Sequence, residues 1–382
     1  MKFAIVGTGF VADYYMTTLP NHPDLQLAGA WDIAPDALRR FCAFHGAKPR
    51  ASLDDILCDP EVAIVANLTA PESHFAVTKA ALEAGKHVYS EKPLTLSFDD
   101  ASELAACASR NGLALCSSPA SVHSAAFALT RETIASGAIG EPRLIYAEME
   151  DGPVFRDKWR EWRSISGAPW PGVHEFEIGC TLEHAGYALA WLVDLFGPVE
   201  KLTAFSATTF PDKGIRRDHP VGPDFSVGGL FFASGAVARL TSGLMARKDR
   251  SMTVHGAEGS LHVADLWDDR SPIWLQRANA KRSVLERIAG RIEARRGHVL
   301  PFSFAQGKRL RYRAEPTARR LPAFPSQIDF SAGVAALAQA VEVGDPQHLR
   351  AVTARSLHLC ELTLALQDSA DRAAHTLRSS LP

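Results

Sequence analysis

The sequence lacks the cysteine patterns that mark disulfide scaffolds and cysteine-rich metal sites. Its 382 residues include six scattered cysteines and no Cys-x-x-Cys pair. This spacing excludes a zinc ribbon or a dithiol redox motif, and it does not supply the dense framework of a small secreted domain. We therefore expect reduced thiols and a cytoplasmic protein.

Long apolar runs and a large net charge are lacking as well. No stretch approaches the roughly 18 apolar residues of a membrane-spanning helix, and residues 1–7 pass directly into a strand pattern, without the segments of a signal peptide. Lys and Arg number 41 against 43 Asp and Glu. The overall charge therefore indicates no anionic partner, and we expect no membrane span and no nucleic-acid binding.

What is present is the composition of a globular protein, with 46% hydrophobic and 22% charged residues. A chain of this length exceeds the usual size of one domain, so two domains are expected.

A glycine-rich turn follows the first apolar run, residues 3–6. Residues 7–12 read G-T-G-F-V-A, a G-x-G-x-x-A pattern. Gly7 permits a tight turn, Gly9 lets a pyrophosphate approach the backbone, and Ala12 allows the next helix to pack closely on the strand. The expected cofactor contacts here are Gly7, Thr8, Gly9, Phe10, Val11 and Ala12.

An acidic residue ends the second predicted strand, residues 25–31. Asp32 lies about 20 residues beyond the glycines, where a carboxylate accepts the ribose hydroxyls of NAD. The same charge repels the 2′-phosphate of NADP, so NAD is the expected cofactor and NADP the less favoured one. Arg39 and Arg40 are the residues that would rescue NADP binding.

Two more buried strands are predicted, at residues 62–66 and 87–90. The second leads into Glu91-Lys92-Pro93. Ligands bind at the carboxyl ends of parallel strands, so Lys92 is a site candidate by its position alone. Further cofactor contacts are expected from Asn67, Thr69, Pro71, His74, Glu91 and Lys92.

The motifs G-T-G-F-V-A, A-P-E-S-H (residues 70–74) and E-K-P, in this order, resemble the Gfo/Idh/MocA family, named for glucose-fructose oxidoreductase, inositol dehydrogenase and a rhizopine catabolism protein. The resemblance continues through residues 137–142, 256–261 and 329–334. It covers most of the chain except roughly residues 267–325.

The resemblance implies an α/β Rossmann domain, here residues 1–120, and an α+β domain with an open, mostly antiparallel sheet, here residues 121–382. Residues 225–232 and 236–243 would form a hairpin of that sheet, and residues 267–325 a basic insertion. Family members often cover one face of this sheet with another subunit, so a homodimer or homotetramer is expected.

The resemblance also implies hydride transfer between NAD and a hydroxyl-bearing carbon of a sugar, polyol or sugar derivative. Lys92 would hold or protonate the reacting oxygen, which requires a depressed pKa for proton exchange near neutrality.

The usual base of the family is missing. Its pattern G-G-x-x-x-D-x-G-x-H corresponds to residues 179–188, and aligning Gly186 with the later glycine places His184 at the Asp position and Ala188 at the His position. These positions lie one helical turn apart on one face, so an imidazole at 184 can reach toward the volume vacated at 188.

His184 is therefore the candidate general base, with Tyr187 or Glu183 orienting it or holding a substrate hydroxyl. The competing interpretation is a histidine that simply packs in the core. The expected catalytic residues are Lys92, His184 and Tyr187.

The stretch from residue 155 to 172 is rich in Trp and Arg. Aromatic faces stack on sugar rings and guanidinium groups bind carboxylate or phosphate, but tryptophans also anchor loops. The expected substrate contacts are Trp159, Trp162, Arg163 and Glu183, with His174 as a weaker candidate.

Residues 277–320 carry thirteen Lys or Arg against three Glu. An amphipathic pattern with Arg287, Arg291 and Arg295 on one face fits an anionic membrane surface or an anionic partner. It fits equally a solvated insertion docked as a lid on the sheet. No metal-ligand spacing is present.

Two other functions stay open. A redox-cycling epimerase, lyase or glycosidase would retain its NAD, and a non-catalytic NAD-binding sensor would need no base. Retention of Lys92 argues against the sensor.

Overall fold

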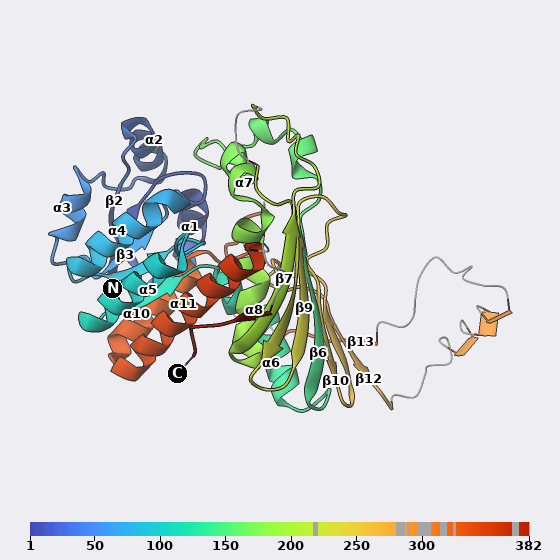
Figure 1. The fold of residues 1–382 in the computed structure, drawn as a ribbon. Coiled ribbons are helices and arrows are strands. Elements are labelled where there is room, and N and C mark those ends of the chain that lie inside the picture. Colours follow the sequence, from blue (N-terminus) through green and yellow to red (C-terminus); the bar gives the residue numbers. More distant parts are fainter. Residues whose placement is uncertain are drawn as a thin grey trace.

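The computed structural model describes residues 1–216, 221–279, 287–288, 291–292, 294–295, 307–313, 319–323, 326–368 and 374–381. Two sheets organise the chain, a parallel one near the N-terminus and a larger, mostly antiparallel one (Figure 1). The predicted fold class is confirmed.

The first sheet has five parallel strands in the order β2-β1-β3-β4-β5. Its two central strands are short apolar runs that are almost fully buried, as expected of a sheet covered by helices on both faces. The strands are β1 (Lys2–Val6), β2 (Gln26–Trp31), β3 (Ile64–Asn67), β4 (His87–Ser90) and β5 (Leu115–Ser117).

Helices connect these strands, and local sequence signals set where several of them begin. The hydroxyls of Ser52 and Ser97 accept the capping hydrogen bonds of α3 and α5, and proline occupies the first turn of α2 and α4. The helices are α1 (Ala12–Thr18), η1 (Leu19–Asn21), α2 (Pro35–His45), α3 (Leu53–Leu57), α4 (Pro71–Glu83) and α5 (Phe98–Arg110).

The second sheet has nine strands in the order β13-β12-β11-β10-β6-β9-β8-β7-β14. All neighbours are antiparallel except β6 and β9, and β8 with β9 forms the predicted hairpin. The strands are β6 (Pro142–Glu150), β7 (Val199–Ala207), β8 (Phe225–Phe232), β9 (Val237–Gly243), β10 (Met252–Gly256), β11 (Gly259–Val263), β12 (Ile273–Arg277), β13 (Lys308–Arg309) and β14 (Ala374–Thr376).

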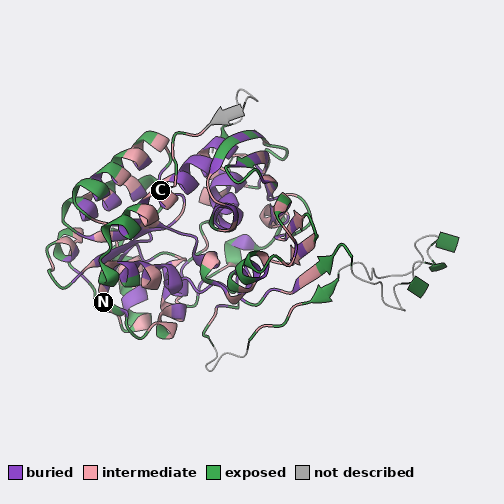
Figure 2. Cartoon of the chain, turned by 90° about the horizontal axis from the view of Figure 1, so that it is seen from below, coloured by how far each residue is buried: buried purple, intermediate pink, exposed green. Residues whose placement is uncertain are grey.

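Helices cover one face of this sheet. Helix α8 is hydrophobic on nearly every side because it packs between β6 of the sheet and the C-terminal helix α11 (Pro346–Gln367), and its Trp191 is fully buried. Figure 2 shows many of the interior helices and strands in the purple of buried residues. The remaining helical segments before residue 200 are η2 (Ala120–His123), α6 (Ala125–Ala135), η3 (Val154–Arg156), η4 (Trp159–Glu161), α7 (Gly172–Ile178), η5 (Thr181–Ala185) and α8 (Gly186–Phe196).

The chain returns to the first domain near its C-terminus through α10 (Ser331–Val343) and α11 (Pro346–Gln367). The hydroxyls of Thr353 and Ser356 in α11 accept hydrogen bonds from the backbone N–H groups of Leu115 and Ser117 in β5. A helix from the predicted second domain thus pairs with the edge strand of the first sheet.

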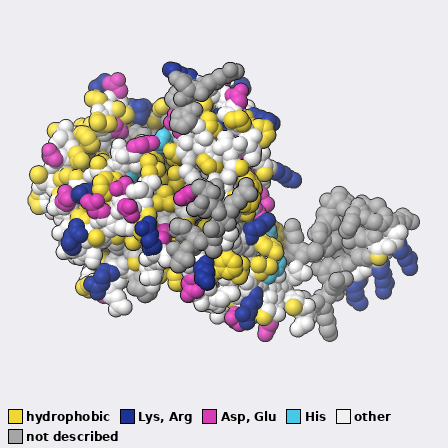
Figure 3. All heavy atoms as spheres, in the orientation of Figure 1, with side chains coloured by type: hydrophobic (Ala, Val, Ile, Leu, Met, Phe, Trp, Pro, Cys, Tyr) yellow, Lys and Arg dark blue, Asp and Glu magenta, His cyan; other side chains and the backbone are white. Residues whose placement is uncertain are grey.

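The predicted basic insertion contributes β12 and β13 to the edge of the large sheet. Its proposed amphipathic helix is described at residues 287–288, 291–292 and 294–295, which are helical and exposed. No helix in the described parts of the chain is long and apolar enough to span a membrane. Basic and acidic side chains alternate over the first domain in the face that Figure 3 shows. The expected oligomer stays a prediction.

Candidate active site

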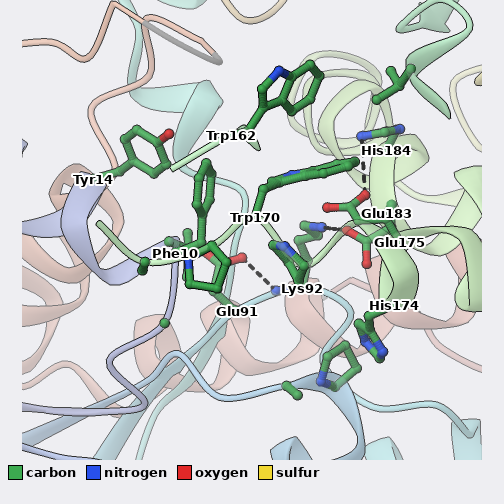
Figure 4. A pocket seen from close by; sticks show the side chains of 18 of the residues that line it. Phe10, Tyr14, Glu91, Lys92, Trp162, Trp170, His174, Glu175, Glu183 and His184 are labelled. Atoms are coloured by element: carbon green, nitrogen blue, oxygen red, sulfur yellow. Dashed lines mark hydrogen bonds and ion pairs between the residues drawn. The ribbon is translucent and has the colours of Figure 1, made fainter. Parts of the chain in front are cut away.

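A cavity of about 900 Å³ lies where the two domains meet. The glycine-rich loop and the ends of β3 and β4 line it from the first domain, and the Trp-rich loop, α7 and η5 line it from the second. Figure 4 shows Phe10 and Tyr14 on one side of Lys92, and Glu175, Glu183 and His184 on the other.

The glycine-rich loop fits a dinucleotide. Gly7 has φ +94°, and a Cβ there would lie 2.6 Å from the backbone of Leu68, so no other residue fits without strain. Gly9 lines the cavity, and a Cβ there would meet no atom within 4 Å. A side chain at position 9 would therefore fill the space that a pyrophosphate needs.

Asp32 holds this loop to the end of β2. One carboxylate oxygen accepts hydrogen bonds from the backbone N–H and the hydroxyl of Thr8, at 2.6 and 2.9 Å, and the other accepts one from the N–H of Ala34 at 2.8 Å. Because each oxygen has two lone pairs, capacity for a ribose hydroxyl remains on the second oxygen.

The two arginines considered for NADP differ in their positions. Arg40 lines the cavity and donates to the carbonyl of Thr8 at 3.1 Å. Arg39 instead pairs with Asp36 on the exposed side of α2.

Several of the expected cofactor contacts lie behind the cavity and do not line it, namely Gly7, Thr8, Ala12, Asp32, Asn67 and His74. The Asn67 amide oxygen accepts a hydrogen bond from the Thr69 hydroxyl at 2.7 Å, and the ring nitrogens of the buried His74 lie 2.6 Å from the Pro93 carbonyl and 3.0 Å from the Thr69 carbonyl. Burial lowers the pKa of His74, so one of these nitrogens donates. Asn67 and His74 thus stabilise the loops behind the cavity, whereas Thr69, Pro71 and Glu91 line it.

Lys92 lies at the carboxyl end of β4, and its ammonium forms an ion pair with the Glu183 carboxylate of η5. Burial, the largest single influence, would lower the pKa of Lys92, but the charge of Glu183 and those of further acidic groups around it together outweigh burial, and the pKa is raised. The expected depressed pKa is therefore wrong. Lys92 is therefore an ammonium group that can donate hydrogen bonds. Burial would raise the pKa of Glu183, but the interaction with Lys92 lowers it, so Glu183 is a carboxylate.

Segment η5 is a turn of π-helix at the position of the missing family pattern. Such wider turns occur often at functional sites. Here consecutive side chains, Glu183 and His184, both line the cavity.

His184 faces two acids. Its Nε2 lies 3.4 Å from Asp151 Oδ2 and 4.0 Å from Glu175 Oε2, while its Nδ1 is buried without a hydrogen-bond partner among the described residues. Burial lowers its pKa despite the charge of Asp151. The ring is therefore neutral near pH 7 and able to accept a proton.

Tyr187 lies against Trp267, with ring centroids 4.6 Å apart. Burial raises the pKa of its phenol, which is consequently a hydrogen-bond donor. The same Trp267 contacts His184, at 5.6 Å between centroids, and carries the guanidinium of Arg250 on its face.

Only one of the three substrate contacts expected from the Trp-rich loop lines the cavity. Trp162 lines the cavity beside Trp170, with centroids 5.0 Å apart. Trp159 does not line it, because its ring packs behind on Phe176, and Arg163 does not, because its guanidinium donates to nearby backbone carbonyls. His174 lines the cavity, 3.5 Å from Glu72.

Sequence reasoning missed several residues that line the cavity. Four of them come from separate elements that no motif connects, the end of β6, α7 and the loops after β9 and β11: Asp151, Glu175, Arg250 and Trp267. The fifth, Trp170, lies in the Trp-rich loop but was not among the expected contacts. Among the described residues, no group of three or more His, Cys, Asp or Glu side chains is placed to hold a metal ion.

Residues 1–118 match the family described as oxidoreductases with an NAD-binding Rossmann fold, and residues 127–262 match the Gfo/Idh/MocA C-terminal domain. The chain is 30% identical to 1,5-anhydro-D-fructose reductase of Ensifer adhaerens over 218 residues, 56% of this chain and 60% of the relative. It is 24% identical to mouse trans-1,2-dihydrobenzene-1,2-diol dehydrogenase over 271 residues, 70% of this chain and 75% of the relative. The chain spans about half the length of the first curated relatives it matches.

Two solved structures share the fold at 20% identity. The 3-ketoreductase of Actinomadura kijaniata, in complex with TDP-benzene and NADP, has a TM-score of 0.68, with 97% of each chain covered. The WlbA dehydrogenase of Bordetella pertussis, in complex with NADH and UDP-GlcNAcA, has a TM-score of 0.67, with 99% of this chain and 97% of that chain covered. From its motifs, its two matched domains and its fold, the chain belongs to the Gfo/Idh/MocA family of oxidoreductases.

Proposed function

We propose that the protein transfers a hydride between NAD and a hydroxyl-bearing carbon of a sugar, polyol or sugar derivative. The observation that carries this proposal is the partly buried Lys92–Glu183 ion pair at the junction of the domains, inside the cavity that the glycine-rich loop also lines. An ammonium fixed in this position stabilises negative charge on the reacting oxygen.

A nicotinamide cofactor would be held by the backbone of residues 9–11, by Thr69 and Pro71, and by Asp32 at the ribose. When bound, it supplies or accepts the hydride. Asp32 favours NAD by charge, and Arg40 is the residue that would meet a 2′-phosphate. The structural neighbours bind either form, NADP in one and NADH in the other.

His184 would accept the hydroxyl proton when an alcohol is oxidised. Its neutral ring supports this role, as does an Nδ1 that has no hydrogen-bond partner in the described parts of the chain. Tyr187, which remains protonated, would donate a hydrogen bond to the substrate.

The walls of the cavity suit a polyhydroxylated ring. Trp162, Trp170 and Trp267 present aromatic faces, and acidic side chains at the same cavity accept hydrogen bonds from hydroxyls. The names of relatives also support this substrate class, since they include 1,5-anhydro-D-fructose reductase and an aldose-aldose oxidoreductase from Caulobacter crescentus in complex with glycerol.

The test is the near-ultraviolet absorbance of NADH with the purified protein, NAD and a panel of sugars and polyols, comparing wild type with Lys92→Met. Stoichiometric NADH formation that the variant loses supports the proposal. Substrate turnover with tightly held NAD and no net NADH would favour the redox-cycling enzyme, and NAD binding without any turnover would favour the sensor.

A further inference from the structure

Two carboxyl groups share the buried part of the cavity with one ammonium group. Glu183 is 5% exposed and pairs with Lys92. The side chain of Glu175, which comes from α7, is 13% exposed, and its Oε2 is buried without a hydrogen-bond partner among the described residues. The closest basic group to Glu175 that the structure records is His184, at 4.0 Å.

The charges of this cluster balance only if Glu175 is neutral. Lys92 compensates Glu183, and Arg250, 3.6 Å from Asp151, compensates that carboxylate. The neutral ring of His184 adds no positive charge for Glu175. Two adjacent carboxylates in a site of low dielectric cannot both ionise when one cation is present. Burial and the charge of Glu183 accordingly raise the pKa of Glu175 well above its ordinary value, and a hydrogen bond to Glu183 stabilises the protonated form.

We propose that Glu175 is the proton donor of this site and that the resting site is set to reduce a carbonyl group. The inference rests on the proposed function and adds to it a direction and a second proton-transfer residue. In the reverse direction Glu175 takes the hydroxyl proton back and passes it to His184, whose Nε2 lies 4.0 Å from Glu175 Oε2, so one proton path serves both oxidation and reduction. The substrate class it names is a keto sugar or a related cyclic ketone.

The chemical step balances as follows. The carbonyl carbon receives a hydride from the reduced nicotinamide, and the π electron pair of the C=O bond moves to the oxygen. That oxygen takes the proton of Glu175, whose O–H bond breaks, so that a hydroxyl forms and Glu175 becomes a carboxylate. The substrate is reduced, the nicotinamide is oxidised, and Glu175 regains a proton from solvent after the product leaves.

The other titratable groups of the cluster are poorer donors. The charge of Glu183 stabilises the protonated form of Lys92, so this ammonium holds the oxygen through the reaction without releasing its proton. Burial has the same consequence for the phenol of Tyr187. His184 rests in its neutral form and lacks an acidic proton.

The first test needs no substrate. A buried protonated carboxyl group has an infrared carbonyl band distinct from the bands of a carboxylate. We expect the difference spectrum between wild type and Glu175→Gln at neutral pH to contain this band. The control, Glu177→Gln on the same helix but outside the cavity lining, should leave it in place. A difference spectrum with carboxylate bands alone would overturn the proposal.

The second test uses 1,5-anhydro-D-fructose and a panel of keto sugars as probes with NADH. Glu175→Gln should lower kcat for reduction by about 100-fold, the usual contribution of a positioned acid, with KM little changed. It should also abolish the fall of activity that the ionisation of Glu175 causes as the pH rises through its raised pKa. Unchanged kcat and an unchanged pH profile would refute the role of Glu175. A wild-type protein that shows the infrared band but neither binds NADH nor reduces any probe would refute the proposed function instead.

Discussion

The carboxylate of Asp13 accepts two hydrogen bonds from Ser166, a residue 153 positions later in the chain. The Ser166 hydroxyl lies 2.7 Å and its backbone N–H 3.2 Å from Oδ2, while the His45 ring lies 2.5 Å from Oδ1. Asp13 is fully buried in α1, directly after the glycine-rich loop. Ser166 lies on the loop that places Trp162 and Trp170 on the cavity wall.

These hydrogen bonds join the Trp-rich loop of the second domain to α1 of the first domain. The loop from residue 162 to 170 is itself held together, since the N–H of Trp170 donates to the carbonyl of Trp162 at 3.2 Å and that of Ala168 to the hydroxyl of Ser164 at 3.0 Å. These hydrogen bonds stabilise the loop internally, and those from Ser166 to Asp13 fix its position against α1.

We predict that Asp13→Ala loosens this loop and speeds the release of NADH about tenfold, because losing a hydrogen bond to a buried charge costs roughly 1.5–3 kcal/mol. Hydrogen exchange of the peptide spanning residues 162–170 and stopped-flow NADH fluorescence measure the two effects. Asp36→Ala, an exposed aspartate paired with Arg39, is the matched control and should change neither. Faster hydrogen exchange of the loop with unchanged NADH release would show that the contact between Asp13 and Ser166 does not determine the rate of NADH release.

Lys92 and Glu183 should depend on one another for stability. Lys92→Met leaves the buried Glu183 carboxylate without its cation, and breaking one side of a buried pair costs about 3–5 kcal/mol. In the double variant Lys92→Met/Glu183→Gln the uncompensated charge is gone, so most of the free energy of unfolding should return. Activity should remain low in both variants, because the ammonium is lost in both. Chemical denaturation together with turnover measures this, and additive losses of stability would contradict a coupled pair.

His184→Ala should lower kcat for alcohol oxidation by about 100-fold, the contribution expected of a general base. Only the neutral ring accepts a proton, and burial lowers the pKa of His184 below 6.5. The wild-type rate should therefore hold through neutral pH and fall only as the pH drops through that lowered pKa. His255→Ala, in β10 and hydrogen-bonded to Ser260, is the matched control. If the His184 variant keeps both its rate and its pH profile, the base lies elsewhere.

The local sequence was informative wherever a backbone conformation or a strand end determined the site. The positive φ of Gly7, the open space at Gly9 and the position of Lys92 after β4 all follow from short motifs. The charge state of Lys92 was mispredicted because it depends on Glu183, which lies 91 residues away. Glu175 lies close to Glu183 in the sequence and was missed for another reason, because the turn at Gly179, with φ +87°, sets how α7 packs against η5.

The contrast between Trp159 and Trp162 shows a second limit to predicting site residues from the sequence. Both belong to one aromatic-rich segment, and composition does not distinguish a ring that packs on Phe176 from one that lines the cavity. The distinction arises from the fold of the loop, in which the N–H of Trp170 bonds to the carbonyl of Trp162.

Asp32 and Arg40 should set cofactor choice in opposite directions. Asp32→Ser removes the charge that repels a 2′-phosphate, so binding of NADP should tighten relative to NAD by about tenfold, the equivalent of about 1.4 kcal/mol. Affinity for NAD itself should fall too, because the Asp32 carboxylate also holds the N–H and hydroxyl of Thr8. In the Asp32→Ser background, Arg40→Ala should weaken NADP and leave NAD nearly unchanged, whereas Arg39→Ala, whose parent side chain pairs with Asp36, should affect neither. Fluorescence titrations of NADH and NADPH give the four affinities, and equal losses of both cofactors on removing Arg40 would mean that this guanidinium supports the loop and does not meet the phosphate.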